Sequence, residues 1–310
     1  RPEYSGVLDR LPGSQCIALA PLTDSETKAL VSELLGGESS IDALGQKIVE
    51  RAAGNPFFAQ EMVRDLAERG VLQGVRGAYS SAAGVAEVSM PATVQATIAA
   101  RIDRLAPDAK RTLSAAAVIG SRFNPGLLET LGIEPRVGDL VLAELVDQVR
   151  FTGAPEYQFH HPLIRSVAYE AQLKSDRAEL HRRVAAAIEA RDPAAVEEAA
   201  ALIAEHLEAA GDLPACYSWH LRAGAWATSR NMAAARGSWE RARTIADSLP
   251  SEDPNQVAMR IAPLTMLCGT AYRVHPNDAS ARFDELRQLC AVTGDKAPLA
   301  VAMAGLVMDH

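Results

Sequence analysis

Hydrophobic residues recur at steps of three and four along most of the chain, a spacing that predicts amphipathic helices. In the clearest example, Met62 and Leu66 fall on one face. Asn55 can cap this helix, and Pro56 then takes the first helical position, where its missing N–H costs nothing. Gly70 is expected to end the helix, because glycine readily adopts the left-handed conformation needed there.

The same periodicity predicts two helices before this one. The first can be capped by Thr23 or Asp24, and the second starts at Ser39 or Ser40. Residues 73–90 are rich in Gly, Ser and Ala and are expected to form a hairpin or a linker.

Between residues 91 and 159 the pattern changes from helices to short strands. Helical periodicity is found in residues 94–105, 107–119, 125–131 and 135–149. Two strands, 149–152 and 157–159, then flank a Gly-Ala-Pro turn. Helices followed by a β-hairpin are typical of a winged-helix domain.

From residue 175 onward the chain again has helical periodicity. Helices are expected at 176–190, 193–210, 213–229, 232–248, 255–273, 278–292 and 297–308. Paired helices with short turns between them indicate an α-solenoid. Trp219, Trp226 and Trp239 fall on these helices; core packing is the default interpretation, and a peptide-binding groove is the alternative.

The N-terminal stretch has a different character. Gln15 to Leu19 has the pattern of a short buried strand, although the chain offers no sheet for it to join. The first residue is Arg1 rather than Met, so we expect a piece of a longer protein.

Composition excludes several classes of function. The net charge is −8, which argues against a nucleic-acid footprint, since that needs a basic stripe. The four cysteines form no C-x-x-C pair and no histidine was identified at ligand spacing from them, so neither a metal site nor a disulfide framework is expected. No apolar run reaches membrane-spanning length and no signal peptide is evident, so a cytoplasmic location is expected.

The sequence also lacks the motifs of nucleotide hydrolysis. It contains no G-x-x-x-x-G-K-[ST] loop, which would hold the β- and γ-phosphates, and no Gly-Lys dipeptide. No strand ends in paired acidic residues that could hold Mg²⁺, and no cyclase carboxylates can be placed. We therefore expect no catalytic residues in this chain, and no tightly bound nucleotide.

Residues 54–72, GNPFFAQEMVRDLAERGVL, resemble the lid of STAND-type AAA+ ATPases, especially the bacterial group linked to class III nucleotidyl cyclases or LuxR-type regulators. In that family a Gly-x-Pro turn contacts the adenine of bound ATP or ADP. The resemblance implies this role for Gly54, Asn55 and Pro56. On local chemistry alone, the turn only starts a helix.

A second stretch, FHHPLIRSVAY at residues 159–169, resembles the winged-helix motif of the same group. There a histidine binds the diphosphate of ADP, which implies this role for His161. The local alternative is that His161 simply precedes Pro162 at a helix start. Arg165, one turn later, is a weaker candidate, and its local alternative is to pair with an acidic side chain. The R-P-E-Y start resembles the end of the family's ATPase core, which would place Arg1 near its sensor position.

Together these resemblances imply a mainly α fold: a helical lid plus a winged-helix domain, followed by a TPR-like α-solenoid. The expected division is 1–20 as a remnant of the nucleotide-binding core, 21–84 as the lid, 85–172 as the winged-helix domain and 173–310 as TPR-like repeats. The repeats would receive a protein or small-molecule signal, without direct contact with nucleic acid or membrane.

These resemblances favour the first of three functions, and the other two remain as alternatives. The first is a regulatory module of a signalling ATPase whose parent protein is an adenylate cyclase, with ATP or ADP bound only in that parent. The second is the same module in a LuxR-type transcriptional regulator. The third is a helical interaction scaffold without a nucleotide role.

Overall fold

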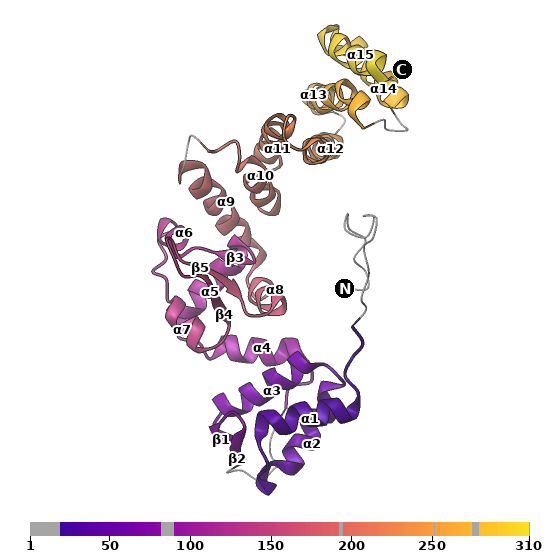
Figure 1. The fold of residues 1–310 in the computed structure, drawn as a ribbon. Coiled ribbons are helices and arrows are strands. Elements are labelled where there is room, and N and C mark those ends of the chain that lie inside the picture. Colours follow the sequence, from indigo (N-terminus) through magenta and orange to yellow (C-terminus); the bar gives the residue numbers. More distant parts are fainter. Residues whose placement is uncertain (1–18, 82–89, 192–194, 251, 275–278, 310) are drawn as a thin grey trace. The chain divides into compact units, whose positions relative to one another are not determined.

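The computed structural model describes residues 19–81, 90–191, 195–250, 252–274 and 279–309. These residues form a mainly α fold, which confirms the prediction from hydrophobic periodicity (Figure 1). Close contacts divide the chain into two compact units, Arg1–Ala106 and Pro107–His310. Each unit has hydrophobic core residues of its own.

The described residues of the first unit form four α-helices and a β-hairpin. Their bounds are α1 Asp24–Leu35, α2 Asp42–Ala52, α3 Pro56–Glu68, β1 Leu72–Val75, β2 Ala78–Ser81 and α4 Val94–Asp103, with a 3₁₀ turn at Ser39–Ile41 before α2. Helices α1, α2 and α3 pack against one another around aliphatic side chains that include Leu44, Ile48 and Met62. The hairpin occupies the start of the Gly-rich stretch, while residues 82–89 lie outside the described part of the chain.

Local capping chemistry fixes the ends of two of these helices. Thr23 caps α1: its hydroxyl accepts from the Glu26 N–H at 3.3 Å, and the Glu26 carboxylate accepts from the Thr23 N–H at 2.8 Å. Gly70 follows α3 in the left-handed conformation with φ 72°, and the Val71 N–H donates to the Leu66 carbonyl at 3.0 Å. The expected glycine stop is therefore confirmed.

The second unit begins with short helices around a small sheet. The elements are α5 Pro107–Ile119, β3 Arg122–Phe123, α6 Pro125–Thr130, α7 Val137–Leu142, β4 Val146–Arg150, β5 Glu156–Phe159 and α8 Pro162–Glu170. The strands are antiparallel in the order β3-β5-β4. The helices and the hairpin that the sequence predicts are present, and β3 adds a third strand.

The boundary between α7 and β4 differs from the prediction. The helix expected to reach residue 149 ends at Leu142, and β4 starts at Val146. Glu144 adopts a left-handed φ of 51°, and the Leu145 N–H donates back to the Leu140 carbonyl at 2.9 Å. This motif terminates the helix and redirects the chain into the sheet.

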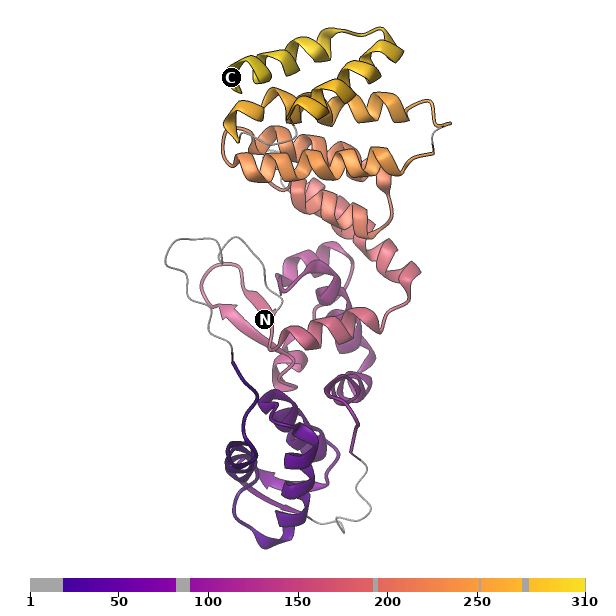
Figure 2. The same cartoon turned by 90° about the vertical axis from the view of Figure 1, so that its right-hand side faces the viewer.

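The rest of the second unit is a helical solenoid. Its helices are α9 Lys174–Arg191, α10 Ala200–Ala209, α11 Leu213–Ala227, α12 Met232–Ser248, α13 Gln256–Gly269, α14 Ala279–Thr293 and α15 Ala297–Asp309. Each helix packs on the next along the chain, and Figure 2 shows the later helices, in orange and yellow, stacked on one another. Helix α9 also packs on α5 and α6, so the solenoid is continuous with the preceding elements instead of separating from them near residue 173.

Two of the three tryptophans belong to the solenoid core, as the default interpretation predicts. Trp219 and Trp239 are buried, with 7% and 1% of their surface exposed. Gly224 of α11 lies directly against the Trp239 indole, and a methyl group at residue 224 would overlap that ring. Trp226 is half-buried, with the Arg230 guanidinium 4.5 Å from its ring centre.

Of the strand expected at residues 15–19, only Leu19 belongs to the described part of the chain. Residues 15–18 of the expected strand lie outside the described residues, as does Arg1. Leu19 is described; it is 92% exposed and belongs to no strand. In the described part of the chain, no helix combines the length and the apolar composition that a membrane span needs.

Candidate functional site

The turn that precedes α3 requires glycine. Gly54 has a φ of 77°, and its carbonyl accepts from the Leu22 N–H at 2.9 Å, which joins the turn to the segment before α1. A Cβ at residue 54 would lie 2.5 Å from the Leu22 carbonyl oxygen and 2.9 Å from the Pro21 Cβ. Both the conformation and the close approach therefore exclude a side chain at this residue.

The two residues after Gly54 are exposed and start α3 as the sequence predicts. The Asn55 side-chain oxygen accepts from the Phe58 N–H at 3.1 Å, so Asn55 is the N-cap. Pro56 occupies the first helical position. The exposed edge of the turn thus consists of the Pro56 ring and the Asn55 amide. The hydrogen bond from the Leu22 N–H to the Gly54 carbonyl anchors this edge to the segment before α1.

A groove of about 900 Å³ lies between α1 and α2, and its lining includes Ala53, the residue directly before this turn. Its floor is aliphatic, formed by residues such as Val31 and Ile41. Its rim is polar and carries more acidic than basic groups: Asp24, Asp42 and Glu50 against Lys28. This charge balance suits an uncharged ring or a cation better than a phosphate.

Helix α3 is also joined to α4 by a partly buried set of ion pairs that sequence reasoning missed. The Arg104 guanidinium lies 2.7 Å from Asp65 and 2.8 Å from Glu68. Arg101 bonds to Glu61 and lies 2.9 Å from Glu68. Burial alone would lower the pKa of Arg104, but its bonds to Glu68 and Asp65 outweigh this and raise it.

These ion pairs bring α4 into the first unit, although the expected division assigned residues 94–103 to the following domain. Glu61 and Arg101 are both almost completely buried, with 0% and 2% of their surface exposed. The acidic residues of α3 follow helical spacing, so the sequence contained a signal for a charged stripe on that helix. It did not identify the partner helix.

His161 has a clear local role in the second unit. It is the N-cap of α8, and its Nδ1 accepts from the Leu163 N–H at 3.1 Å. This bond places the proton of a neutral ring on Nε2. His161 is half-buried, whereas the preceding His160 is exposed and pairs with Asp147 at 2.9 Å.

Arg165 also has a local partner. Its Nε donates to the Ala117 carbonyl at 3.0 Å and joins α8 to α5. The sequence-based alternative of a carboxylate partner is replaced here by a backbone carbonyl.

The predicted nucleotide residues belong to different parts of the chain. Gly54, Asn55 and Pro56 lie in the first unit, His161 lies in the second, and Arg1 lies outside the described residues. The structure supports a rigid turn and a capping histidine, while their roles toward ATP or ADP stay predictions.

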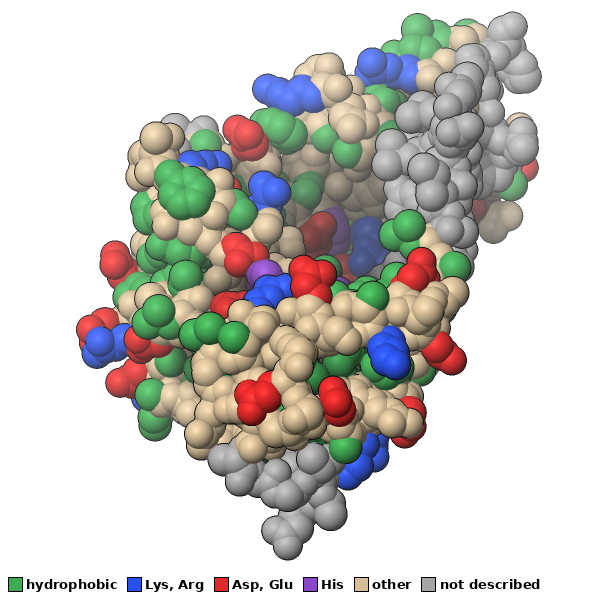
Figure 3. Space-filling model, turned by 60° about the horizontal axis from the view of Figure 1, so that its bottom comes forward, with side chains coloured by type: hydrophobic (Ala, Val, Ile, Leu, Met, Phe, Trp, Pro, Cys, Tyr) green, Lys and Arg blue, Asp and Glu red, His purple; other side chains and the backbone are tan. Residues whose placement is uncertain are grey.

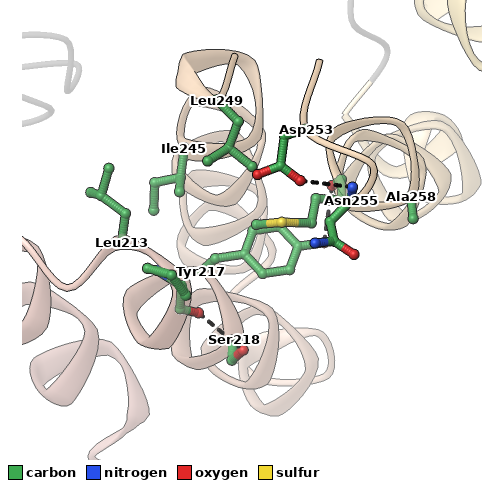
Figure 4. A pocket seen from close by; sticks show the side chains of 10 residues that line it. Leu213, Tyr217, Ser218, Ile245, Leu249, Asp253, Asn255 and Ala258 are labelled. Atoms are coloured by element: carbon green, nitrogen blue, oxygen red, sulfur yellow. Dashed lines mark hydrogen bonds between the residues drawn. The ribbon is translucent and has the colours of Figure 1, made fainter. Parts of the chain in front are cut away.

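The solenoid contains a second pocket, of about 470 Å³, between α11, α12 and the start of α13. Figure 4 shows the Tyr217 ring at its centre, with Leu213, Ile245 and Leu249 along one side. The Tyr217 hydroxyl donates to the Met259 carbonyl at 2.9 Å, and burial raises its pKa to about 12. The pocket is therefore mainly apolar, with a tyrosine that stays protonated at neutral pH.

Two groups of titratable side chains in the solenoid were also missed from the sequence. His181 and His206 bond to each other through their Nδ1 atoms at 2.8 Å, and the Tyr169 hydroxyl lies 3.0 Å from the His181 Nε2. Cys216 and His220 are one helical turn apart on α11, which corrects the sequence-based statement that no histidine lies at ligand spacing from a cysteine.

Surface charge bears on possible partners. On the face shown in Figure 3, acidic and basic side chains are intermingled rather than gathered by sign. This is consistent with the acidic composition of the chain.

Comparisons with known proteins give three matches. A family model described as a domain of unknown function, DUF8739, matches residues 23–73, which include the Gly54 turn. The uncharacterized protein R02095 of Rhizobium meliloti (strain 1021) is 28% identical over 280 residues, which are 86% of this chain and 26% of that protein. The chain thus spans about a quarter of that relative's length.

Among solved structures, the chain aligns with PH0952 from Pyrococcus horikoshii, a signal transduction ATPase with numerous domains (STAND) that has a tetratricopeptide repeat sensor. The alignment covers 92% of this chain and 44% of that chain. The sequence identity is 12% and the TM-score is 0.37.

Proposed function

We propose that this chain is a regulatory segment of a STAND-type signal-transduction ATPase, with the first unit as its lid and α5–α8 as its winged-helix region. The observation that carries the proposal is the turn at residues 54–56. Gly54 cannot carry a side chain, and the adjoining Asn55 and Pro56 are exposed and rigidly held. Such an edge offers backbone and the apolar ring of Pro56 to a flat base such as adenine.

The acidic rim of the neighbouring groove indicates which end of a nucleotide this unit would contact. Three carboxylates and one lysine line the rim, so phosphates are disfavoured there and a neutral adenine is tolerated. The phosphates of ATP or ADP would then be held by other parts of the parent protein. His161 is our candidate for one such contact, because the neutral ring carries a proton on Nε2.

The solenoid of α9–α15 is the candidate sensor in this proposal. Helical solenoids offer extended surfaces to partners, and the mainly apolar pocket beside Tyr217 suits an aliphatic or aromatic group of a protein or small-molecule signal. We further propose that the output domain of the parent is a nucleotidyl cyclase. A LuxR-type output is the alternative, and determining the sequence that surrounds this chain in its gene separates the two.

The decisive experiment measures ADP dissociation from a longer chain that adds the residues preceding Arg1. Pro56→Ala and His161→Ala should each raise the ADP off-rate roughly ten- to a hundredfold, which corresponds to the loss of one contact to a bound ligand. Pro125→Ala and His160→Ala are matched controls, because Pro125 also follows an asparagine cap and His160 adjoins His161. These controls should leave the off-rate unchanged.

Unchanged off-rates in folded Pro56→Ala and His161→Ala proteins would refute the nucleotide roles and favour a scaffold function. Calorimetry of residues 1–310 alone provides a second test. Because the chain lacks a phosphate-binding loop, ADP should bind it only weakly. A micromolar affinity would contradict the proposal that other parts of the parent protein hold the phosphates.

A further inference from the structure

Three potential metal ligands meet between α10 and α11 of the solenoid. They are the Cys216 sulfur, a nitrogen of His220 and a carboxylate oxygen of Glu208, and all lie within 4.8 Å of one another. Cys216 and His220 share one face of α11 because they are four residues apart, and Glu208 comes from the helix that packs against it. We propose that these three residues form a binding site for a zinc-like divalent cation.

The state of His220 supports the proposal. Only 6% of the His220 side-chain surface is exposed, and neither ring nitrogen has a hydrogen-bond partner among the described residues. Buried polar atoms without partners are rare because each loses its hydrogen bonds to water without gaining others. The His220 Nε2 lies 3.7 Å from Glu208, too far for a hydrogen bond but close to the spacing of two ligands on one tetrahedral ion.

The donor set selects the class of ion. A thiolate, an imidazole and a carboxylate are ligands of zinc and similar borderline-soft cations, whereas Mg²⁺ and Ca²⁺ require oxygen ligands. Cys216 is fully buried and Glu208 is one-third exposed, so the ion would enter from the Glu208 side. Three protein ligands leave a fourth position for water.

Binding must displace a proton from the thiol. Burial first, and then the Glu208 carboxylate, raise the pKa of Cys216 to about 12, so the empty site holds a thiol that donates to the Ala204 carbonyl at 3.3 Å. Burial lowers the pKa of His220, which keeps its ring neutral and able to ligate. One proton should therefore leave to solvent for each ion bound.

Arg241 is the group that opposes the ion. Its guanidinium lies 3.1 Å from the same Glu208 oxygen that faces His220. The Arg241 side chain is 60% exposed, so it can turn toward solvent when a cation binds. This competition should limit the affinity.

Titration of the 310-residue chain with Co²⁺ and with Zn²⁺ tests the proposal. Co²⁺ should produce a thiolate-to-metal charge-transfer absorption at one equivalent, and Zn²⁺ should abolish it by displacement. Cys216→Ala should remove this absorption, and Glu208→Gln should weaken binding about tenfold or more. Cys290→Ala and Glu205→Gln are matched controls: a buried cysteine on α14, outside any such cluster among the described residues, and an exposed glutamate on α10.

Absence of a thiolate band in the unaltered chain would overturn the proposal without any variant. Binding that survives Cys216→Ala with unchanged affinity would also overturn it, because the ion would then occupy other groups. Glu208→Gln changes a partly exposed side chain and so keeps the test valid if Cys216→Ala fails to fold. None of these outcomes depends on the nucleotide role proposed above.

Discussion

At the scale of single residues, Gly54 combines two constraints that can be separated by experiment. Its φ of 77° disfavours any residue with a side chain, and a Cβ would also meet the Leu22 carbonyl at 2.5 Å. Gly70 has a similar φ of 72°, but nothing lies within 4 Å of its Cβ position. The two glycines therefore share the conformational constraint and differ in the steric one.

Gly70→Ala should lower the free energy of unfolding of the first unit by about 1 kcal/mol, the cost of a left-handed residue. Gly54→Ala should lower it by roughly 3 kcal/mol, because overpacking is added. Urea denaturation followed by circular dichroism measures both values. Equal effects of the two substitutions would mean that the segment at Leu22 moves away from the added methyl group at little cost in free energy.

The His181–His206 pair gives a prediction about pH. Burial, and then the Arg165 and Arg177 cations, lower the pKa of His181 to about 4. Burial, and then His181 and Arg165, lower the pKa of His206 to about 4. An unfolded histidine titrates near pH 6.5, so the unfolded chain binds more protons between about pH 6.5 and 4. Stability of the second unit is therefore full above this window and falls as pH decreases through it.

His206→Leu removes one of these titrating groups and should make the loss of stability between pH 6.5 and 4 shallower. The measurement is the urea midpoint of residues 107–310 at several pH values. His160→Ala, at an exposed histidine outside this pair, is the matched control. The same slope in His206→Leu would assign the acid sensitivity to other groups.

Which residues could be predicted from sequence depended on the range of their interactions. Asn55 and Pro56 were predictable because a cap and a first-turn proline act within four residues. The pairing of His181 with His206 was not predictable, because it joins α9 to α10. Cys216 and His220 have a helical spacing that could have been noticed, but Glu208 needed the packing of two helices.

At the scale of elements, ion pairs join α3, the helix that follows the Gly54 turn, to α4 near the end of the first unit. Glu61 is fully buried and contacts both Arg101 and Arg64. Removal of one charge from a buried pair leaves the other uncompensated, which typically costs about 3–5 kcal/mol. Any movement of α3 is therefore expected to carry α4 with it.

Glu61→Gln should destabilise the first unit by about 3–5 kcal/mol in urea denaturation. Glu68→Gln should cost much less, because Glu68 is one-third exposed and solvent screens its charge. The double variant Glu61→Met, Arg101→Met should recover most of the lost stability, since it removes both buried charges of this pair and leaves only their partly exposed partners Arg64 and Glu68. A double variant as unstable as Glu61→Gln would show that the network matters through shape rather than charge.

Element boundaries were less predictable than the elements themselves. The sequence prediction continued the helix of residues 135–149 through Leu145, yet the helix ends at Leu142. The helix ends because Glu144 adopts a left-handed conformation, which a glutamate in the sequence does not predict. The type of each element followed from its hydrophobic period, whereas this ending depended on an unusual backbone conformation.

At the scale of the whole chain, the position of the division between units has consequences for folding. The sequence indicated a joint between Gln172 and Ser175, where the helical repeats begin. The contacts instead divide the chain between Ala106 and Pro107, since α9 packs on α5 and α6. Arg183 of α9 bonds to the Leu131 carbonyl just after α6, and Gln172 donates to the Ser114 carbonyl of α5 at 3.1 Å.

Cutting the chain at the two positions should therefore have different effects. Residues 1–106 and 107–310 each keep their contacts and should fold with cooperative thermal transitions in circular dichroism. Residues 173–310 lose the surface that α5 and α6 cover on α9, so this piece should melt at a lower temperature than 107–310 or lose the protection of α9 from proteolysis. Equal melting temperatures for 173–310 and 107–310, with α9 protected in both, would mean that the solenoid is self-sufficient. The joint inferred from the sequence would then describe the folding units better than the contacts do.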